Sequence, residues 1–310
     1  MVAGPTNIAT VLQGSFPVWT IYAFVTYFIA FMLCIGGVFL WWARHRKERP
    51  PEQFKLLRAP GETQRRRVQQ ADEDMLFYFF VAAFGPLVVA WLFLLIVVRL
   101  PKAFAPLGAG FDMLVFFGGL LFAGTRLFRL LRRRRDDLLG YLGERPVAEQ
   151  LDLLRLEGFR VFHDVPAEGR RKNFNIDHVV VGPSGVTAIE VKTRRKKRGR
   201  PGREEHVVRF DGQRLVWPWG EDRCGIDQLQ SETEWLREFI HTRTGLRVNP
   251  KAILALPGWY VTEGVVGAFR VANHKLLPTI VREWNSQPIT DQQIDLISRQ
   301  LDERCRDVED

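Results

Sequence analysis

The segment IDHVVVGPSGVTAIEVK, which spans Ile176 to Lys192, decides the fold of the C-terminal half of the chain. It contains two runs rich in β-branched residues, separated by the loop Gly182-Pro183-Ser184-Gly185. Such runs, bounded by glycine and proline, are typical of a β-hairpin. If the residues on either side of the loop pair, pairing continued outward places Asp177 directly opposite Glu190. The segment therefore predicts a hairpin with two facing carboxylates.

Lys192 extends this pair into a three-residue cluster. Side chains alternate between the faces of a strand, so Lys192 shares a face with Asp177 and Glu190, whereas Ile189 and Val191 point to the other face. A charge cluster on a solvated sheet with no function is the alternative interpretation. The strands are otherwise apolar, and burial of opposed carboxylates is costly unless a cation or an ammonium compensates. This cost favours a site for a divalent cation and an activated water.

Several blocks around the hairpin complete a recognisable pattern. They are GERPVAEQL (Gly143–Leu151), HDVP (His163–Pro166), NIDHVVVGPSG (Asn175–Gly185) and IEVK (Ile189–Lys192). Together they resemble the nuclease-related domain (NERD), a member of the PD-(D/E)XK superfamily of restriction-endonuclease-like folds, over about Leu138 to Leu256. The resemblance implies an α/β (α+β) domain with a central mixed sheet and a metal-dependent nuclease activity.

Hydrolysis of a phosphodiester needs a cation that neutralises the scissile phosphate and lowers the pKa of an attacking water. Mg²⁺ prefers oxygen ligands and uses one or two protein carboxylates. We expect Asp177, Glu190 and the carbonyl of Val191 to bind Mg²⁺ or Mn²⁺. Lys192 is expected to hold or deprotonate the water and to stabilise charge on the phosphoryl oxygens.

The resemblance also assigns two residues outside the hairpin to the catalytic set. It places Glu144 in the metal shell, with Glu149 as the nearby competitor and a solvated helix face as the alternative. It matches Gln228 to a glutamine that orients Lys192 or touches the nucleic-acid backbone, against ordinary helix capping. His178 points away from Asp177 and is expected to be a packed histidine.

A basic loop follows the hairpin at the mouth of the predicted site. It covers Arg194–Arg203, and its expected nucleic-acid contacts are Arg194, Arg195, Lys196, Lys197, Arg198 and Arg200. A solvated basic connector is the alternative. After Lys192 the chain has Thr193 and this basic run where many family members have an Asn-aromatic pair.

Composition limits the other classes of function. The net charge of +9 suits an anionic partner, either nucleic acid or a membrane surface. The three cysteines have no metal-ligand spacing, and no Walker-type phosphate loop is present, which argues against a zinc site and an NTPase. The expected partners are nucleic acid, DNA rather than RNA, a lipid bilayer and a second copy of the chain.

Residues 1–135 differ in composition from the rest of the chain, because they contain long apolar runs. Three apolar runs, about 18–42, 76–98 and 103–124, are candidates for transmembrane helices, since about 20 apolar residues span a bilayer. The third run contains Asp112 and Pro106, and a re-entrant or interfacial helix is the alternative there. The expected architecture is an α-helical transmembrane region followed by a cytoplasmic domain over 138–310.

Basic residues orient these spans. They concentrate between Arg44 and Asp74 and after Arg126, whereas none precedes Arg44. The positive-inside rule therefore puts the N-terminus outside and the C-terminal domain in the cytoplasm, which requires three spans. The run Arg132–Arg135 is expected to anchor the topology and to contact lipid headgroups.

The soluble part predicts three clear helices. The first covers about Pro146–Glu157, with Pro146 in its first turn and Gly158 after its end. The second covers Ile226–Arg243 and the last Asp291–Val308. We expect a membrane-anchored, Mg²⁺-dependent nuclease. The rival hypothesis is a catalytically silent module of the same fold that binds nucleic acid or protein at the membrane.

Overall fold

The computed structural model describes residues 18–45, 55–97, 105–168, 173–196, 205–223, 225–262, 264–266, 269–284 and 287–308. The chain divides into two compact units. The N-terminal unit comprises Met1–Glu52 and Leu76–Leu127, and the C-terminal unit comprises Gln53–Met75 and Phe128–Asp310. Residues 53–75, which the sequence analysis assigned to the membrane region, thus belong to the same unit as the sheet.

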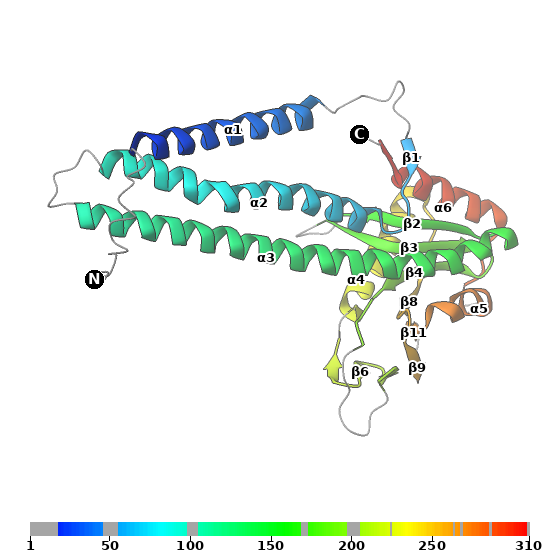
Figure 1. Cartoon of the computed structure of the whole chain (residues 1–310). Helices are drawn as coiled ribbons and strands as arrows, with labels where there is room; N and C mark the ends of the chain where they lie inside the picture. Colours follow the sequence, from blue (N-terminus) through cyan, green and yellow to red (C-terminus); the bar gives the residue numbers. More distant parts are fainter. Residues whose placement is uncertain are drawn as a thin grey trace, which may run out of the picture. The chain divides into compact units, whose positions relative to one another are not determined.

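The described part of the N-terminal unit is helical (Figure 1). It contains α1 (Val18–His45) and the apolar parts of α2 (Glu62–Val97) and α3 (Ala105–Asp152). These helices contain the described parts of the three apolar runs, whereas residues 98, 103 and 104 lie outside the described residues. Among the described residues, one helix, Pro106–Glu157, is long and apolar enough to cross a membrane by length and composition, and Val25–Val38 is a shorter apolar helix.

A six-stranded mixed sheet forms the centre of the C-terminal unit. Its order is β10-β11-β8-β4-β3-β2, in which β4 and β11 run parallel to β8 and the other pairs are antiparallel. The strands are β2 (Arg160–Ala167), β3 (Phe174–Gly182), β4 (Gly185–Val191), β8 (Lys251–Ala255), β10 (Val265–Val266) and β11 (Phe269–Ala272). The mixed sheet expected from the sequence is confirmed.

The hairpin has the predicted register. Val181 pairs with Val186, and the ladder continues to the pair His178 and Ile189. One step further, the backbone N–H of Val191 donates to the Asp177 carboxylate at 2.7 Å. The sequence pattern therefore fixed this register correctly, because a slip of one residue would exchange the faces of every side chain.

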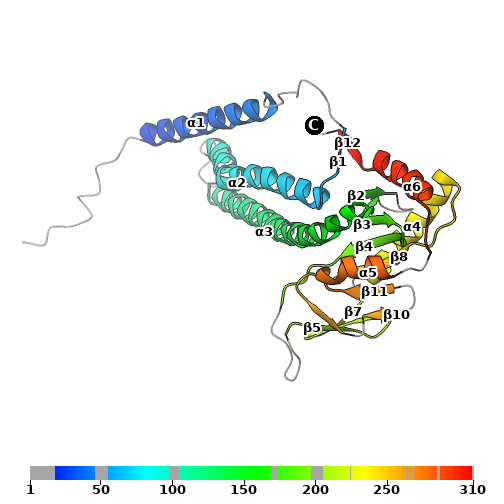
Figure 2. The ribbon, with the colours of Figure 1, turned by 90° about the vertical axis from the view of Figure 1, so that its right-hand side faces the viewer.

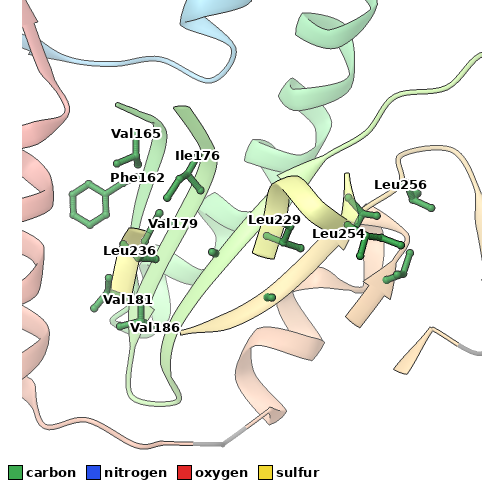
Figure 3. Close-up of a cluster of buried hydrophobic side chains, with 14 of the residues drawn as sticks. Phe162, Val165, Ile176, Val179, Val181, Val186, Leu229, Leu236, Leu254 and Leu256 are labelled. Atoms are coloured by element: carbon green, nitrogen blue, oxygen red, sulfur yellow. The ribbon is translucent and has the colours of Figure 1, made fainter. Parts of the chain in front are cut away.

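Helices cover both faces of the sheet (Figure 2). On one face, α4 (Ile226–Thr244) and α6 (Asp291–Arg304) pack against side chains such as Val179, as the cluster in Figure 3 shows. On the other face, Val180 packs with the end of α3 and with α5 (Leu277–Glu283). The fully buried valines alternate between these two cores, as the period of a strand requires.

Two small sheets and two short 3₁₀ helices complete the unit. The four-stranded sheet has the order β7-β6-β5-β9, and the two-stranded sheet pairs β1 with β12. The elements are β5 (Val207–Phe210), β6 (Leu215–Trp217), β7 (Gly220–Asp222), β9 (Tyr260–Thr262), β1 (Lys55–Leu57), β12 (Arg306–Val308), η3 (Leu153–Glu157) and η4 (His274–Leu276).

Two predicted helix boundaries were wrong. No helix starts at Pro146, because α3 passes through this proline and continues to Asp152. The proline costs one backbone hydrogen bond, but complete burial of Val147 and Leu151 just after it outweighs the local preference. The last helix ends at Arg304, and Arg306–Val308 instead forms a strand with a partner from the distant β1.

Candidate active site

One cavity of about 720 Å³ lies within the C-terminal unit. The hairpin, the end of α3, the first turn of α4 and the segment around β1 and α2 supply its walls. The cavity brings together all five side chains that the sequence nominated as catalytic: Glu144, Asp177, Glu190, Lys192 and Gln228. Val191, the third expected metal ligand, also lines it.

Asp177 and Glu190 are buried at the end of the hairpin, with 7% and 1% of their surface exposed. Burial raises the pKa of Asp177 well above its ordinary value, and the neighbouring Glu190 adds to the shift. Burial likewise raises the pKa of Glu190, with Glu232 as the next cause. Neither carboxylate can ionise at low cost unless a cation lies beside it.

Lys192 supplies one such cation. Its ammonium donates to Oε1 of Glu190 and to Oε1 of Gln228, the latter at 2.8 Å. Space for its stem comes from Gly225, which precedes α4 at φ +87°. A Cβ at Gly225 would lie 2.8 Å from Cγ of Lys192 and 2.8 Å from Leu254, so only glycine fits this approach.

Glu232 is a site residue that the sequence analysis missed. It is fully buried on α4, and its Oε1 accepts from Nε2 of Gln228 at 2.7 Å. Burial raises the pKa of Glu232 to about 7, with Asp177 as the next cause. Its spacing from Gln228 is i, i+4, so both project from one face of the helix. That spacing was the available signal. Gln228 thus links Lys192 to Glu232.

The structure distinguishes the two glutamates that competed on α3. Glu144 is 3% exposed and lines the cavity, whereas Glu149 is exposed. Burial raises the pKa of Glu144 to about 10, and Asp177 and Asp164 add to the shift. The position that the resemblance selected is therefore the one that lies at the site.

The donor set fits a hard divalent cation. The described residues contain no group of three or more His, Cys, Asp and Glu side chains arranged as a metal cluster. However, Oε2 of Glu144, Glu190 and Glu232 is buried and accepts no hydrogen bond from the described protein atoms. A carboxylate oxygen in this state needs either a shared proton or a cation. Oxygen donors of this kind are those that Mg²⁺ and Mn²⁺ prefer.

His178 behaves as predicted. It is fully buried, and its Nδ1 lies 2.9 Å from Nδ1 of His163. Burial lowers the pKa of His178 well below its ordinary value, with His163 as the next cause. A neutral imidazole held in the sheet by another ring is a packed histidine.

The described part of the basic loop contacts the protein itself. Arg194 pairs with Asp222 at 3.1 Å, and Arg195 donates to the backbone carbonyl of Arg135 at 3.1 Å. Lys196 lies over the ring of Trp259 at 5.9 Å. These three basic residues are not among those that line the cavity, within the described chain. Lys197, Arg198 and Arg200 lie outside the described residues.

Comparison with known proteins found a match between part of the chain and one family model. Residues 139–257 match the family model of the nuclease-related domain (NERD). This range contains the five nominated catalytic side chains and excludes residues 53–75 of the same unit. No curated protein matches the chain. No solved structure matches it either.

Proposed function

We propose that this protein is a membrane-anchored, metal-dependent nuclease that hydrolyses phosphodiester bonds, with DNA as the expected substrate. The nuclease-related domain supports a nuclease-related function in general. The observation that carries the finer proposal is the cavity that gathers Asp177, Glu190 and Lys192 with Glu144 and Gln228. A site of this composition supplies cation ligands and, beside them, an ammonium that donates to Glu190 and Gln228.

Each residue has a role in this proposal. Asp177, Glu190 and the Val191 carbonyl hold the cation, and Glu144 adds a further carboxylate. A bound Mg²⁺ or Mn²⁺ supplies charge neutralisation and an acidified water. The Lys192 ammonium donates to a phosphoryl oxygen and holds the attacking water. Gln228 accepts from that ammonium at 2.8 Å, which keeps Lys192 pointed into the cavity.

The rival function is a silent binding module. The ion pair between Lys192 and Glu190 is the observation in its favour, since the ammonium already compensates one carboxylate without a metal. In an active enzyme, cation binding competes for Glu190 and leaves Lys192 available to the substrate. In a silent module, the pair persists and divalent cations have no effect.

Membrane anchoring rests on the N-terminal unit. The described parts of the three apolar runs, 18–42, 76–97 and 105–124, lie in α1, α2 and α3, and exposed large apolar side chains such as Tyr27, Phe77 and Leu107 occur on all three helices. Exposed apolar surface of this extent needs a nonpolar environment. We place the N-terminus outside and the C-terminal unit in the cytoplasm, following the basic segments.

The test uses the full chain in detergent micelles. Plasmid, linear duplex and single-stranded substrates are incubated with Mg²⁺, with Mn²⁺ or with chelator. We expect cleavage only with metal. Asp177→Asn and Glu190→Gln should reduce both metal affinity and cleavage, whereas Lys192→Ala should abolish cleavage and leave metal affinity near that of the wild type, because an ammonium is no ligand. Unchanged metal affinity in both carboxylate variants contradicts the proposal.

A further inference from the structure

One wall of the cavity comes from outside the matched domain. Arg58, Thr63, Gln64 and Arg67 line it, and all four lie far upstream of residue 139, where the family match begins. They belong to the C-terminal unit, as part of Gln53–Met75. Residues 55–67, here called the wall segment, therefore contribute to the site although sequence comparison assigns them to no domain.

The wall segment is attached at its start by backbone pairing. β1 pairs antiparallel with β12, and the N–H of Arg58 donates to the carbonyl of Cys305 at 3.0 Å (Figure 2). Cys305 is buried at the end of α6. Cys305 and β12 thus hold the start of the wall segment in place.

A buried aspartate holds the middle of the wall segment. Asp164 on β2 is 1% exposed and adopts φ +49°, a left-handed conformation that non-glycine residues rarely adopt. Its carboxylate accepts from Nε of Arg58 at 2.9 Å, and from the backbone N–H and the hydroxyl of Thr63 at 3.0 and 2.8 Å. Asn175 donates to it at 2.7 Å. These bonds compensate both the buried charge and the strained backbone.

Gly61 brings the wall segment against α3. Its φ of +69° is a glycine conformation, and a Cβ there would lie 2.8 Å from the ring of Tyr141. An added Cβ at Gly61 would also lie 3.5 Å from Oε2 of Glu144, and the Gly61 backbone opposes the rise in the pKa of Glu144 that burial causes. The wall segment therefore touches a residue of the predicted metal shell directly.

The side chains on the first turns of α2 form two sets, one that lines the cavity and one that pairs with Glu62. Thr63, Gln64 and Arg67 are spaced i, i+1 and i+4, and all three line the cavity. Arg65 and Arg66 instead pair with Glu62, at 2.9 and 2.8 Å. Arg67 is exposed, and no hydrogen bond or ion pair occupies its guanidinium among the described residues. Burial raises the pKa of Asp137, which also lines the cavity, and the charge of Arg67 opposes this rise.

We propose that Arg67 binds a phosphate of the nucleic-acid substrate and that Thr63 is the positioning residue that holds this turn of α2 against the site. The inference rests on the proposed function, because it names a substrate contact of the same cavity. A guanidinium with several donors suits a phosphate, and its charge offsets part of the repulsion that a polyanion would meet at a cavity lined by more acidic than basic side chains.

The binding experiment uses the full chain in detergent micelles with a labelled duplex and chelator, so that no turnover occurs. Arg67→Gln should weaken binding about 3- to 10-fold and reduce the slope of log affinity against log salt by about one. Arg66→Gln is the matched control, since it removes the same charge one residue away. We expect this control to change affinity less than about twofold, a smaller loss than that of one phosphate contact.

Thr63 is tested by kinetics with Mg²⁺. Thr63→Val removes the hydroxyl that bonds Asp164, so KM should rise as in Arg67→Gln while kcat changes little. Thr63→Ser should restore KM, and the double variant Thr63→Val/Arg67→Gln should be no worse than either single one. Loss of thermal stability with unchanged KM in Thr63→Val contradicts the positioning role.

The outcomes separate the two proposals. If the wild type cleaves and binds nucleic acid but Arg67→Gln and Arg66→Gln are indistinguishable in affinity and salt slope, the Arg67 inference fails and the nuclease proposal stands. If the wild type neither binds nor cleaves, both fail. A selective loss in Arg67→Gln supports the inference.

Discussion

Glu144 is a buried carboxylate at the cavity, with 3% of its surface exposed. Burial raises its pKa to about 10, so the folded, metal-free protein binds this proton over a pH range in which the unfolded chain has released it. The contribution of Glu144 to the free energy of unfolding is therefore greatest below the pKa of the unfolded chain, near 4.5, and falls as the pH rises towards the folded-state pKa of about 10. A bound cation removes the same penalty.

Glu144→Gln should therefore gain stability relative to the metal-free wild type as the pH rises from 5 to 8, by on the order of a few kcal/mol. Chelator-treated thermal and denaturant unfolding measures the difference. Glu149→Gln is the matched control, because Glu149 is exposed on the same helix. An equal pH profile for both variants would show that Glu144 is not buried as described.

Glu144→Gln should also reduce cleavage in the presence of Mg²⁺ about 10- to 100-fold, the usual cost of losing a group that supports a metal site. Glu149→Gln should keep wild-type activity. Initial rates at several Mg²⁺ concentrations provide the measurement, and rescue of Glu144→Gln by high Mg²⁺ would assign the loss to metal affinity. A fully active Glu144→Gln would remove Glu144 from the metal shell.

Among the helices, α4 offers a controlled comparison because glycine lies at both ends. Gly225 before it has φ +87° and faces Lys192, whereas Gly245 after it has φ +73° and has no other heavy atom within 4 Å of an added Cβ. Both positions resist a side chain on backbone grounds. Of the two, Gly225 also provides space for Lys192, the side chain proposed to be catalytic.

Gly225→Ala and Gly245→Ala should each cost about 1–2 kcal/mol of stability from the left-handed conformation. Gly225→Ala should in addition reduce cleavage strongly, since Lys192 must leave its place, whereas Gly245→Ala should keep its activity. Melting temperatures and kcat for both variants test this. Equal activity losses would mean that α4 acts through its stability alone.

Elements that depend on local sequence signals were predicted, whereas an element that depends on a partner far along the chain was not. The hairpin register and the span of α4 were predicted within a residue or so, because turn residues and apolar periodicity are local signals. The strand Arg306–Val308 was not predicted, because the strand with which it pairs, Lys55–Leu57, lies about 250 residues earlier in the sequence. Glu232 was missed because its i, i+4 spacing from Gln228 indicates a shared helix face but not that this face is buried.

At the scale of the whole molecule, the resemblance located the site but not its full extent. It assigned Glu144, which lines the cavity, to the metal shell, and it offered Gln228 as a residue that orients Lys192 or touches the nucleic-acid backbone; in the structure Gln228 accepts from Lys192 at 2.8 Å. It could not include the wall segment, because residues 55–67 lie outside the range 139–257 that matches the family model. Contacts such as that between Arg58 and Asp164 bridge more than a hundred residues, and no local pattern encodes them.

The topology of the whole chain gives a further prediction. Reporter fusions at Asn7 and Gly108 should report the outside of the membrane, and a fusion at Asp310 should report the cytoplasm, because the basic segments flank the cytoplasmic ends. Paired alkaline phosphatase and green fluorescent protein fusions provide the measurement. A cytoplasmic signal at Gly108 contradicts three spans.

The pairing of β1 with β12 has a consequence for the order of events during synthesis. The wall segment, which comprises β1 and the start of α2, leaves the ribosome early, but the strand that fixes its start is the last one described in the chain. A nascent chain therefore carries its hairpin and α4 before the wall can dock, and such a distant contact forms slowly. The cavity thus gains this wall only after synthesis has passed β12, and in the proposed membrane-anchored arrangement the N-terminal helices would by then already hold the chain at the membrane.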